Sequence, residues 1–332
     1  MLENPAATPP DVRMRVTEHY DRAERPLFSY EIIPPKRGGS VATVLGLVEA
    51  LAPYEPPFID VTSHSAEKVY EEMPDGTVRK RVKRKRPGTL GLCAAIQYRF
   101  GIDAVPHILC RGFTREETED ALIELNYLGI HNVLAVRGDD TGVSKAGRPD
   151  RTCNEHASDL VAQIGRMNAG HYLADLLDAA PTHFCVGVGG YPEKHVDAPN
   201  RTWDVLNLKR KVDAGADYVV SQMFFDNGHF LDWQARCREV GVTVPIVPGL
   251  KILTSKRQLQ SIPRAFYTEI PEALAAEVEE ARDEHVADVG VEWARRQAEE
   301  LLDAGVPGIH FYIMSTVRHV VRVAEPLRRL VG

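Results

Sequence analysis

The sequence lacks the features that mark several protein classes. Its 332 residues include five cysteines, an odd number without a C-x-x-C pair, so we expect reduced thiols rather than disulfides or a cysteine zinc site. No run of about eighteen apolar residues is present to span a membrane, and the N-terminus has no apolar core like that of a secretory signal. These absences predict a cytoplasmic protein without a membrane partner.

Motifs with fixed spacing are also missing. The sequence has no Walker A loop, no G-x-S-x-G, no H-E-x-x-H and no metal-ligand spacing of His, Cys and Asp. The glycine cluster Gly187–Gly190 has the wrong spacing for a dinucleotide fingerprint and leads into Pro192 instead of a helix. The formal net charge of −7 argues against a nucleic-acid partner held by overall charge.

What the sequence does contain is a regular alternation of apolar runs with helical patterns. The pattern of Arg115–Leu128, for example, follows a capping box formed by Thr114 and Glu117. Eight such alternations favour a single-domain (β/α)₈ TIM barrel over residues 26–332, after a flexible polar arm over residues 1–25. The expected strands are Leu27–Ile33, Phe58–Thr62, Val105–Cys110, Asn132–Val136, Phe184–Val188, Tyr218–Met223, Val244–Val247 and Ile309–Ile313.

A basic insertion around residues 71–87 separates the second and third expected strands. Within it, Arg79–Arg86 reads RKRVKRKR, with seven basic residues in eight positions. One interpretation is a nucleic-acid or nuclear-localisation patch, and the other is a solvated hairpin or rim loop near an anionic ligand. The net acidic charge of the chain favours the second interpretation.

Polar residues collect where the expected strands end, which is the catalytic face of a barrel. Glu31 lies between apolar neighbours, and it is either a salt-bridged structural residue or a general acid with a pKa raised by burial. Arg137 and Gly138 suit a phosphate and a close backbone approach, although a salt-bridged corner is the more common role of such a turn.

The helix expected after the fifth strand has two stripes. Asp204, Asn207 and Lys211 are spaced three and four residues apart and share one polar face. The neighbouring face is apolar, so the polar stripe either is solvated or borders a ligand at the barrel rim. With an acid, cations and hydrogen-bonding groups but no metal site, the residues suit a reaction in which a cofactor supplies the chemistry.

These same stretches resemble the bacterial 5,10-methylenetetrahydrofolate reductase family, from about Phe28 to about Tyr312. The resemblance implies a (β/α)₈ flavoprotein with FAD at the carboxyl ends of its strands. NADH or NADPH would reduce the flavin, which would then reduce methylenetetrahydrofolate to 5-methyltetrahydrofolate in a ping-pong reaction, and a homo-oligomer is implied. The segments that carry the resemblance are Tyr30–Lys36, Pro106–Cys110, Asn132–Asp139, Gly190–His195, Asp204–Asp217 and Ser221–Asp226.

The resemblance also implies a role for individual residues. Glu31 matches the acid that assists opening of the folate methylene bridge, and Asp139 matches a carboxylate near flavin and pterin. Gln222 and Gln258 match folate contacts, and Thr62 matches a contact to FAD and to the nicotinamide. The remaining matches to FAD contacts are His107, Arg137, Gly138, Asp139, Ala157, Tyr191, His195, Asp204, Asn207, Arg210 and Lys211.

Three segments depart from the family pattern, and two alternatives stay open. Val61–Ser65 lacks an aromatic residue after Thr62, Pro248–Ile252 is altered, and Phe311–Thr316 lacks a folate-contacting arginine. These departures leave room for a catalytically inactive or flavin-poor barrel that serves as a partner subunit. A second alternative is a Schiff-base lyase with Lys251 as its nucleophile.

Overall fold

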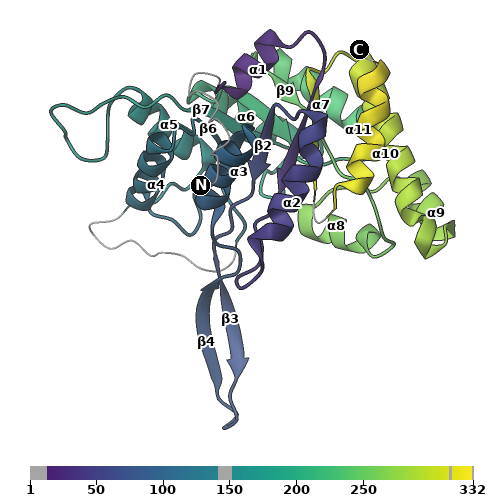
Figure 1. The fold of residues 1–332 in the computed structure, drawn as a ribbon, viewed down its shortest axis with the longest axis horizontal. Helices are drawn as coiled ribbons and strands as arrows, with labels where there is room; N and C mark the ends of the chain where they lie inside the picture. The colour runs from purple at the N-terminus through teal and green to yellow at the C-terminus, as the bar shows by residue number, and fades with distance from the viewer. Residues whose placement is uncertain (1–12, 141–151, 314–315, 331–332) are drawn as a thin grey trace, which may run out of the picture.

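The computed structural model describes residues 13–140, 152–313 and 316–330, and its centre is a parallel sheet surrounded by helices (Figure 1). Nine strands are hydrogen-bonded in the order β10-β11-β1-β2-β5-β6-β7-β8-β9, and each pair of neighbours is parallel. Their bounds are β1 Leu27–Ile32, β2 Phe58–Val61, β5 Asp103–Leu109, β6 Asn132–Val136, β7 Cys185–Gly190, β8 Tyr218–Ser221, β9 Ile246–Val247, β10 Gly249–Leu250 and β11 Gly308–Tyr312.

The two strands at the ends of this order, β9 and β10, are halves of one stretch interrupted by Pro248. Proline has no N–H to donate to a neighbouring strand, but its carbonyl oxygen accepts from the His310 N–H at 2.9 Å. Because β9 pairs with β8 and β10 pairs with β11, the sheet nearly closes on itself. The expected (β/α)₈ barrel is confirmed, and the strand ends differ from the predicted ones by no more than two residues.

Helices form the outer layer of the barrel. Helix α4 begins as predicted: Thr114 Oγ1 accepts from the Glu117 N–H at 3.2 Å, and the Glu117 carboxylate accepts from the Thr114 N–H at 2.9 Å. The helices are α2 Val41–Leu51, α3 Thr89–Phe100, α4 Arg115–Tyr127, α5 Ala157–Asn168, α6 Arg201–Asp213, α7 Asn227–Glu239, α8 Gln258–Phe266, α9 Glu272–Glu280, α10 Val286–Asp303 and α11 Arg318–Leu330, with short 3₁₀ turns at Ala52–Tyr54 and Asp283–His285.

The N-terminal segment differs from the expected loose arm, because α1 Val16–Arg22 is an ordered helix against the barrel. Val16 is fully buried and packs in the cluster that includes Phe58 and Tyr218. Its N–H donates to Asn132 Oδ1 at 2.9 Å, and His19 Nε2 lies 2.7 Å from Asp103 Oδ2. The periodicity of so short a helix is too weak to identify it in a polar, proline-bearing sequence.

The basic insertion forms an antiparallel hairpin, β3 Ala66–Glu72 and β4 Val78–Arg84, which projects from the barrel (Figure 1). The hairpin thus starts at Ala66 rather than around residue 71, and its largely exposed strands agree with the solvated hairpin named in the second interpretation. In the part of the chain that the structure describes, no helix is both long and apolar enough to cross a membrane.

Candidate active site

The mouth of the barrel holds a cluster of ionisable side chains from four strands, β1, β2, β5 and β11. Glu31 of β1 lies opposite His107 of β5, with 3.4 Å between Glu31 Oε2 and His107 Nε2. Asp60 of β2 lies 3.7 Å from the same His107 nitrogen. Asp60 Oδ2 also lies 4.0 Å from Nδ1 of His310 on β11, which is hydrogen-bonded to Ser29 Oγ at 2.9 Å.

Burial controls the protonation of this cluster. It raises the pKa of Glu31 to about 7, aided by the charge of Asp60 and opposed by His107 and Lys251. Burial alone would lower the pKa of His107, but its interactions with the carboxylates of Asp60 and Glu31 raise it overall. Burial lowers the pKa of His310 to about 4, so this ring is neutral near pH 7.

Asp60 is the least satisfied member of the cluster. Its side chain is 1% exposed, and both carboxylate oxygens lack a hydrogen-bond donor among the described residues. A buried carboxylate without a donor is costly, so its charge is balanced by the neighbouring His107. This pairing favours a protonated His107 directly beside Glu31.

Lys251 follows β10 and points back to the strand next to it. Its Nζ donates to the Tyr312 carbonyl oxygen at 2.9 Å, and the residue is 8% exposed. Burial lowers the pKa of Lys251 to about 8, and Glu31 acts in the opposite direction. The amine is therefore mostly charged at pH 7 and adds a cation near Glu31.

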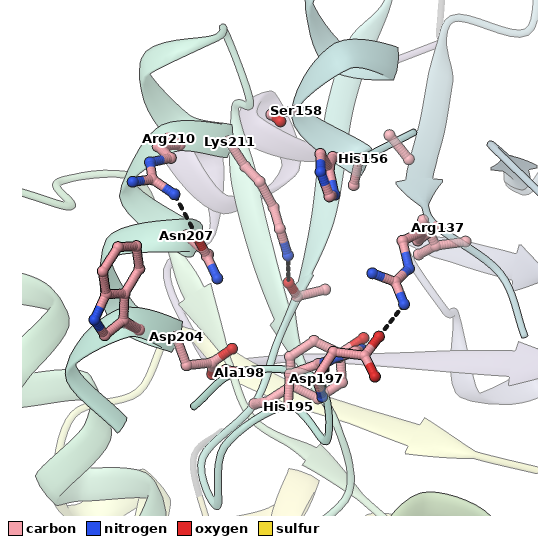
Figure 2. A pocket seen from close by; sticks show the side chains of 16 residues that line it. Arg137, His156, Ser158, His195, Asp197, Ala198, Asp204, Asn207, Arg210 and Lys211 are labelled. Carbon is pink, nitrogen blue, oxygen red and sulfur yellow. Dashed lines mark hydrogen bonds and ion pairs between the residues drawn. The ribbon is translucent and has the colours of Figure 1, made fainter. Parts of the chain in front are cut away.

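A cavity of about 390 Å³ lies at the ends of β6 and β7 beside α5 and α6. Figure 2 shows Arg137 and Lys211 reaching into it from opposite walls. Eight of the residues predicted to contact FAD line this one cavity: Arg137, Ala157, Tyr191, His195, Asp204, Asn207, Arg210 and Lys211.

Helix α6 supplies the polar wall of the cavity. Asn200 caps the helix, because its Oδ1 accepts from the Trp203 N–H at 2.9 Å. Val205 and Leu208 are buried against the barrel, which confirms the predicted apolar stripe. The polar stripe is therefore turned toward the cavity and is not simply solvated.

The charges in the cavity are held in place by partners. Lys211 Nζ donates to the Gly189 carbonyl oxygen at 2.8 Å, and burial lowers its pKa to about 8 while Asp204 opposes that shift. Arg137 forms an ion pair with Asp197, and Arg210 donates to Asn207 Oδ1 at 2.7 Å (Figure 2). The cavity thus offers cations, two carboxylates, an amide and the Tyr191 ring.

The turn after β6 contains a glycine in a left-handed conformation. Gly138 has a φ of +83°, and a Cβ there would meet Leu109 only at an ordinary 3.6 Å. The left-handed backbone is therefore a sufficient reason for glycine at this position. The Asp139 that follows is exposed at the rim, and its charge acts on His64 and Tyr191.

The other predicted contacts lie outside the cavity. Thr62 Oγ1 is 3.1 Å from His64 Nε2 at the end of β2. Gln222 Oε1 accepts from the Met223 N–H at 2.9 Å, just after β8. Gln258 Oε1 accepts from the Thr254 and Ser255 N–H groups, so it already holds the loop that leads into α8. Within the altered segment Phe311–Thr316, Met314 and Ser315 lie outside the described residues.

Sequence reasoning missed Asp60, His310 and Asp197. The first two could have been found by the argument applied to Glu31, because each is a polar residue inside an apolar strand. Asp197 follows no pattern, since it meets Arg137 across 60 positions of sequence. Within the described ranges, no three His, Cys, Asp or Glu side chains are grouped so that they could hold a metal ion.

Comparison with known proteins agrees with this geometry. The family model for methylenetetrahydrofolate reductase matches residues 15–328. The 5,10-methylenetetrahydrofolate reductase of Escherichia coli (strain K12) is 29% identical over 292 residues, which cover 86% of this chain and 86% of that protein. Methylenetetrahydrofolate reductase 2 of Saccharomyces cerevisiae is 27% identical over 96% of this chain and 50% of its own length. The chain spans about half the length of the eukaryotic relatives that it matches.

A solved structure supports the fold. It is that of an uncharacterized protein from Clostridium thermocellum, described as binding two copies of 5-methyl-5,6,7,8-tetrahydrofolic acid. The TM-score is 0.61 at 12% sequence identity, with 95% of this chain and 99% of that chain covered. At this identity the likeness concerns the architecture alone.

The strand order and the ionisable groups at the barrel mouth define the class, a (β/α)₈ barrel with an enzyme-type site at the carboxyl ends of its strands. The family model covers nearly the whole chain. The chain belongs to the methylenetetrahydrofolate reductase family, as its sequence motifs predicted.

Proposed function

We propose that this chain reduces 5,10-methylenetetrahydrofolate to 5-methyltetrahydrofolate with electrons from NADH or NADPH, using bound FAD. The observation that carries the proposal is that one barrel holds both the cluster of Glu31, His107 and Asp60 and a cavity lined by eight of the residues that match FAD contacts. Family membership supplies the reaction class, and the cluster supplies an acid suited to it.

The side chains that line the cavity suit the diphosphate and sugar groups of a dinucleotide such as FAD. Lys211 and Arg137 provide the cations that a pyrophosphate requires. Asp204, Asn207 and His195 provide hydrogen-bonding groups for sugar hydroxyls. When bound, FAD would supply hydride transfer between the nicotinamide and the folate. Thr62, Gln222 and Asp139 would contact the substrates at the rim.

Glu31 would act as the general acid. A carboxyl with a pKa of about 7 is about half protonated at neutral pH, which is the range in which proton donation is most effective. Its proton on Oε2 would pass to a folate nitrogen as the methylene bridge opens. His107 Nε2, 3.4 Å away, could then return a proton to Glu31.

The test is to load the purified chain with FAD and assay it with NADH, NADPH and methylenetetrahydrofolate while 5-methyltetrahydrofolate is measured by chromatography. We expect one FAD per chain and formation of the product. A chain that binds no FAD and forms no product would instead support the inactive partner barrel. Trapping of a carbonyl substrate on Lys251 by borohydride would support the lyase.

A further inference from the structure

A second cavity, of about 270 Å³, lies at the root of the β3–β4 hairpin and is separate from the one that suits FAD. Its walls come from the hairpin, the starts of α3 and α4, and β5. The residues that matter for its chemistry are Ser63, Arg84, Arg86, Leu90, His107 and Phe113. His107 is the one member that the family resemblance had singled out.

We propose that this root pocket binds the carboxylate-bearing glutamate tail of the folate, with Arg84 and Arg86 as its anion-binding groups. The inference rests on the proposed function and assigns a substrate tail site within it. Elongated substrates with several glutamates would then be preferred over those with one.

Arg84 and Arg86 are the hairpin cations best placed to meet a new anion at this pocket. The Arg84 guanidinium lies 4.7 Å from the Phe113 ring centroid, and Arg86 Nη1 donates to the Pro34 carbonyl oxygen at 2.6 Å. Among the described residues, neither arginine has a carboxylate within 4 Å. By contrast, Arg81 and Lys85 already pair with Glu71 and Glu67 at 2.9 and 3.0 Å.

One carboxylate also lines the pocket, that of Glu117. It accepts from the Thr114 N–H at 2.9 Å and so forms part of the capping box of α4. A carboxylate at a helix N-terminus is stabilised by the helix dipole. The two arginines therefore leave the pocket with a surplus of positive charge.

The root of the hairpin is fixed to the segment that follows Glu31. Arg37 donates from its N–H to the Lys85 carbonyl oxygen at 2.7 Å and from Nε to the Arg84 carbonyl oxygen at 3.1 Å. Together with the bond from Arg86 to Pro34, these contacts hold the arginines in a set position relative to the strand that carries Glu31. A preorganised site loses little conformational entropy on binding.

The position of His107 links the acid to the pocket. This side chain lies 3.4 Å from Glu31 and also lines the root pocket. A ligand whose reacting end meets Glu31 can therefore place an apolar segment near Leu90 and Phe113 and its carboxylates near the arginines.

The charge along the hairpin favours a repeated anion over a single phosphate. Residues 66–86 contain eight Lys or Arg and four Asp or Glu, whereas the whole chain has a net charge of −7. The face of the hairpin that carries Arg84 also carries Lys80 on the same strand and Lys68, which pairs with Val82. A row of carboxylates can meet such a series, while a lone phosphate needs only the first members.

The experiment compares methylenetetrahydrofolate with one and with five glutamates as substrates of the FAD-loaded protein. For the natural sequence we expect a KM about tenfold lower for the five-glutamate form. Arg84→Gln/Arg86→Gln should remove most of that preference. The control Arg79→Gln/Lys80→Gln removes the same charge farther along β4 and should keep the preference for the five-glutamate substrate. In 0.5 M salt the difference between the two KM values should become smaller.

Three results would overturn the tail site: equal KM values for the two substrates, equal loss of preference in both variants, or an effect of the root variant on the nicotinamide KM alone. The last would assign the pocket to a dinucleotide phosphate. Equilibrium dialysis of the two folates against the same variants measures their binding affinities without turnover. Failure of catalysis with a retained binding preference would count against the proposed function and not against the tail site.

Discussion

At the scale of single residues, the account depends on a proton held by Glu31. The Glu31 carboxyl keeps its proton to about pH 7 because it is buried near Asp60, while His107 and Lys251 limit the shift. The surroundings therefore tune an ordinary carboxyl for proton donation near neutral pH.

Replacing the acid should separate the two half-reactions. Glu31→Gln preserves the shape but cannot donate a proton, so we expect folate reduction to fall by a factor of about 10² to 10⁴. Reduction of the bound flavin by NADH should change by less than about threefold, because that step does not use the proton. Stopped-flow absorbance measures both steps, and equal loss of both would show that Glu31 is not a specific acid.

The pH dependence has a definite sign. The Glu31 pKa is raised from 4.5 to about 7, so the folded protein retains a proton that the unfolded chain releases between these values. This contribution to the free energy of unfolding is present below pH 4.5 and is lost as the pH rises through 7.

Two measurements follow from that sign. The rate of folate reduction should decline as the pH rises above about 7, while the rate of flavin reduction by NADH should not follow the same curve. Urea titrations should show that the stability of the natural sequence falls between pH 4.5 and 7 more steeply than that of Glu31→Gln. Parallel stability curves would refute the raised pKa.

At the scale of elements, β7 and α6 both line the cavity that we propose holds FAD. Adjacent glycines at the end of β7 have different surroundings: a Cβ on Gly190 would lie 2.5 Å from the Trp233 ring, whereas one on Gly189 would meet only Tyr191 Oη at 3.9 Å. The strand end therefore has no room for a side chain on the side that faces α7.

This contrast predicts that two alanine variants lose different amounts of stability. Gly190→Ala forces the Trp233 ring to move and should lower the free energy of unfolding by about 1 to 3 kcal/mol. Gly189→Ala should change it by less than about 1 kcal/mol. Chemical denaturation of both variants gives the comparison, and similar stabilities would contradict the tight packing of Gly190 on α7.

Helix α6 provides a second matched pair. Lys211 lines the cavity and donates to the Gly189 carbonyl oxygen, while Lys209 does not line it and pairs with Asp213 one turn farther along the helix. Lys211→Met should weaken FAD binding about tenfold or more, because a cation for the pyrophosphate is lost. Lys209→Met should leave FAD affinity within about twofold, since the Lys209 side chain does not line the cavity. Flavin fluorescence quenching measures both affinities, and equal affinities would remove Lys211 from the site.

At the scale of the whole molecule, the barrel was predictable and part of its site was not. Both faces of the strands are covered, so their apolar runs are nearly continuous, and helices with caps lie between them. Contacts such as that of Arg137 with Asp197 join loops far apart in sequence, and no local pattern encodes them. Helix α1 was missed for the same reason, because its stability comes from Val16 packing into the barrel rather than from its own sequence.

The same distinction explains the hairpin. Its charge was evident from the sequence, but the antiparallel pairing of Ala66–Glu72 with Val78–Arg84 and its attachment through Arg37 and Arg86 emerged only from the fold. Glu31 was found because it interrupts an apolar strand, and the polar stripe of α6 was found because it follows helical spacing. Asp60 and His310 were overlooked although they also lie within apolar strands.

The central claim is that one FAD on this chain passes electrons from a nicotinamide to the folate. The most direct test is an anaerobic titration of the FAD-loaded protein, first with NADH or NADPH and then with methylenetetrahydrofolate. We predict that one equivalent of donor abolishes the flavin absorbance. Addition of methylenetetrahydrofolate should then restore the absorbance fully and form an equal amount of 5-methyltetrahydrofolate. Formation of that product by protein that holds no flavin, or a reduced flavin that the folate leaves unchanged, would contradict the account.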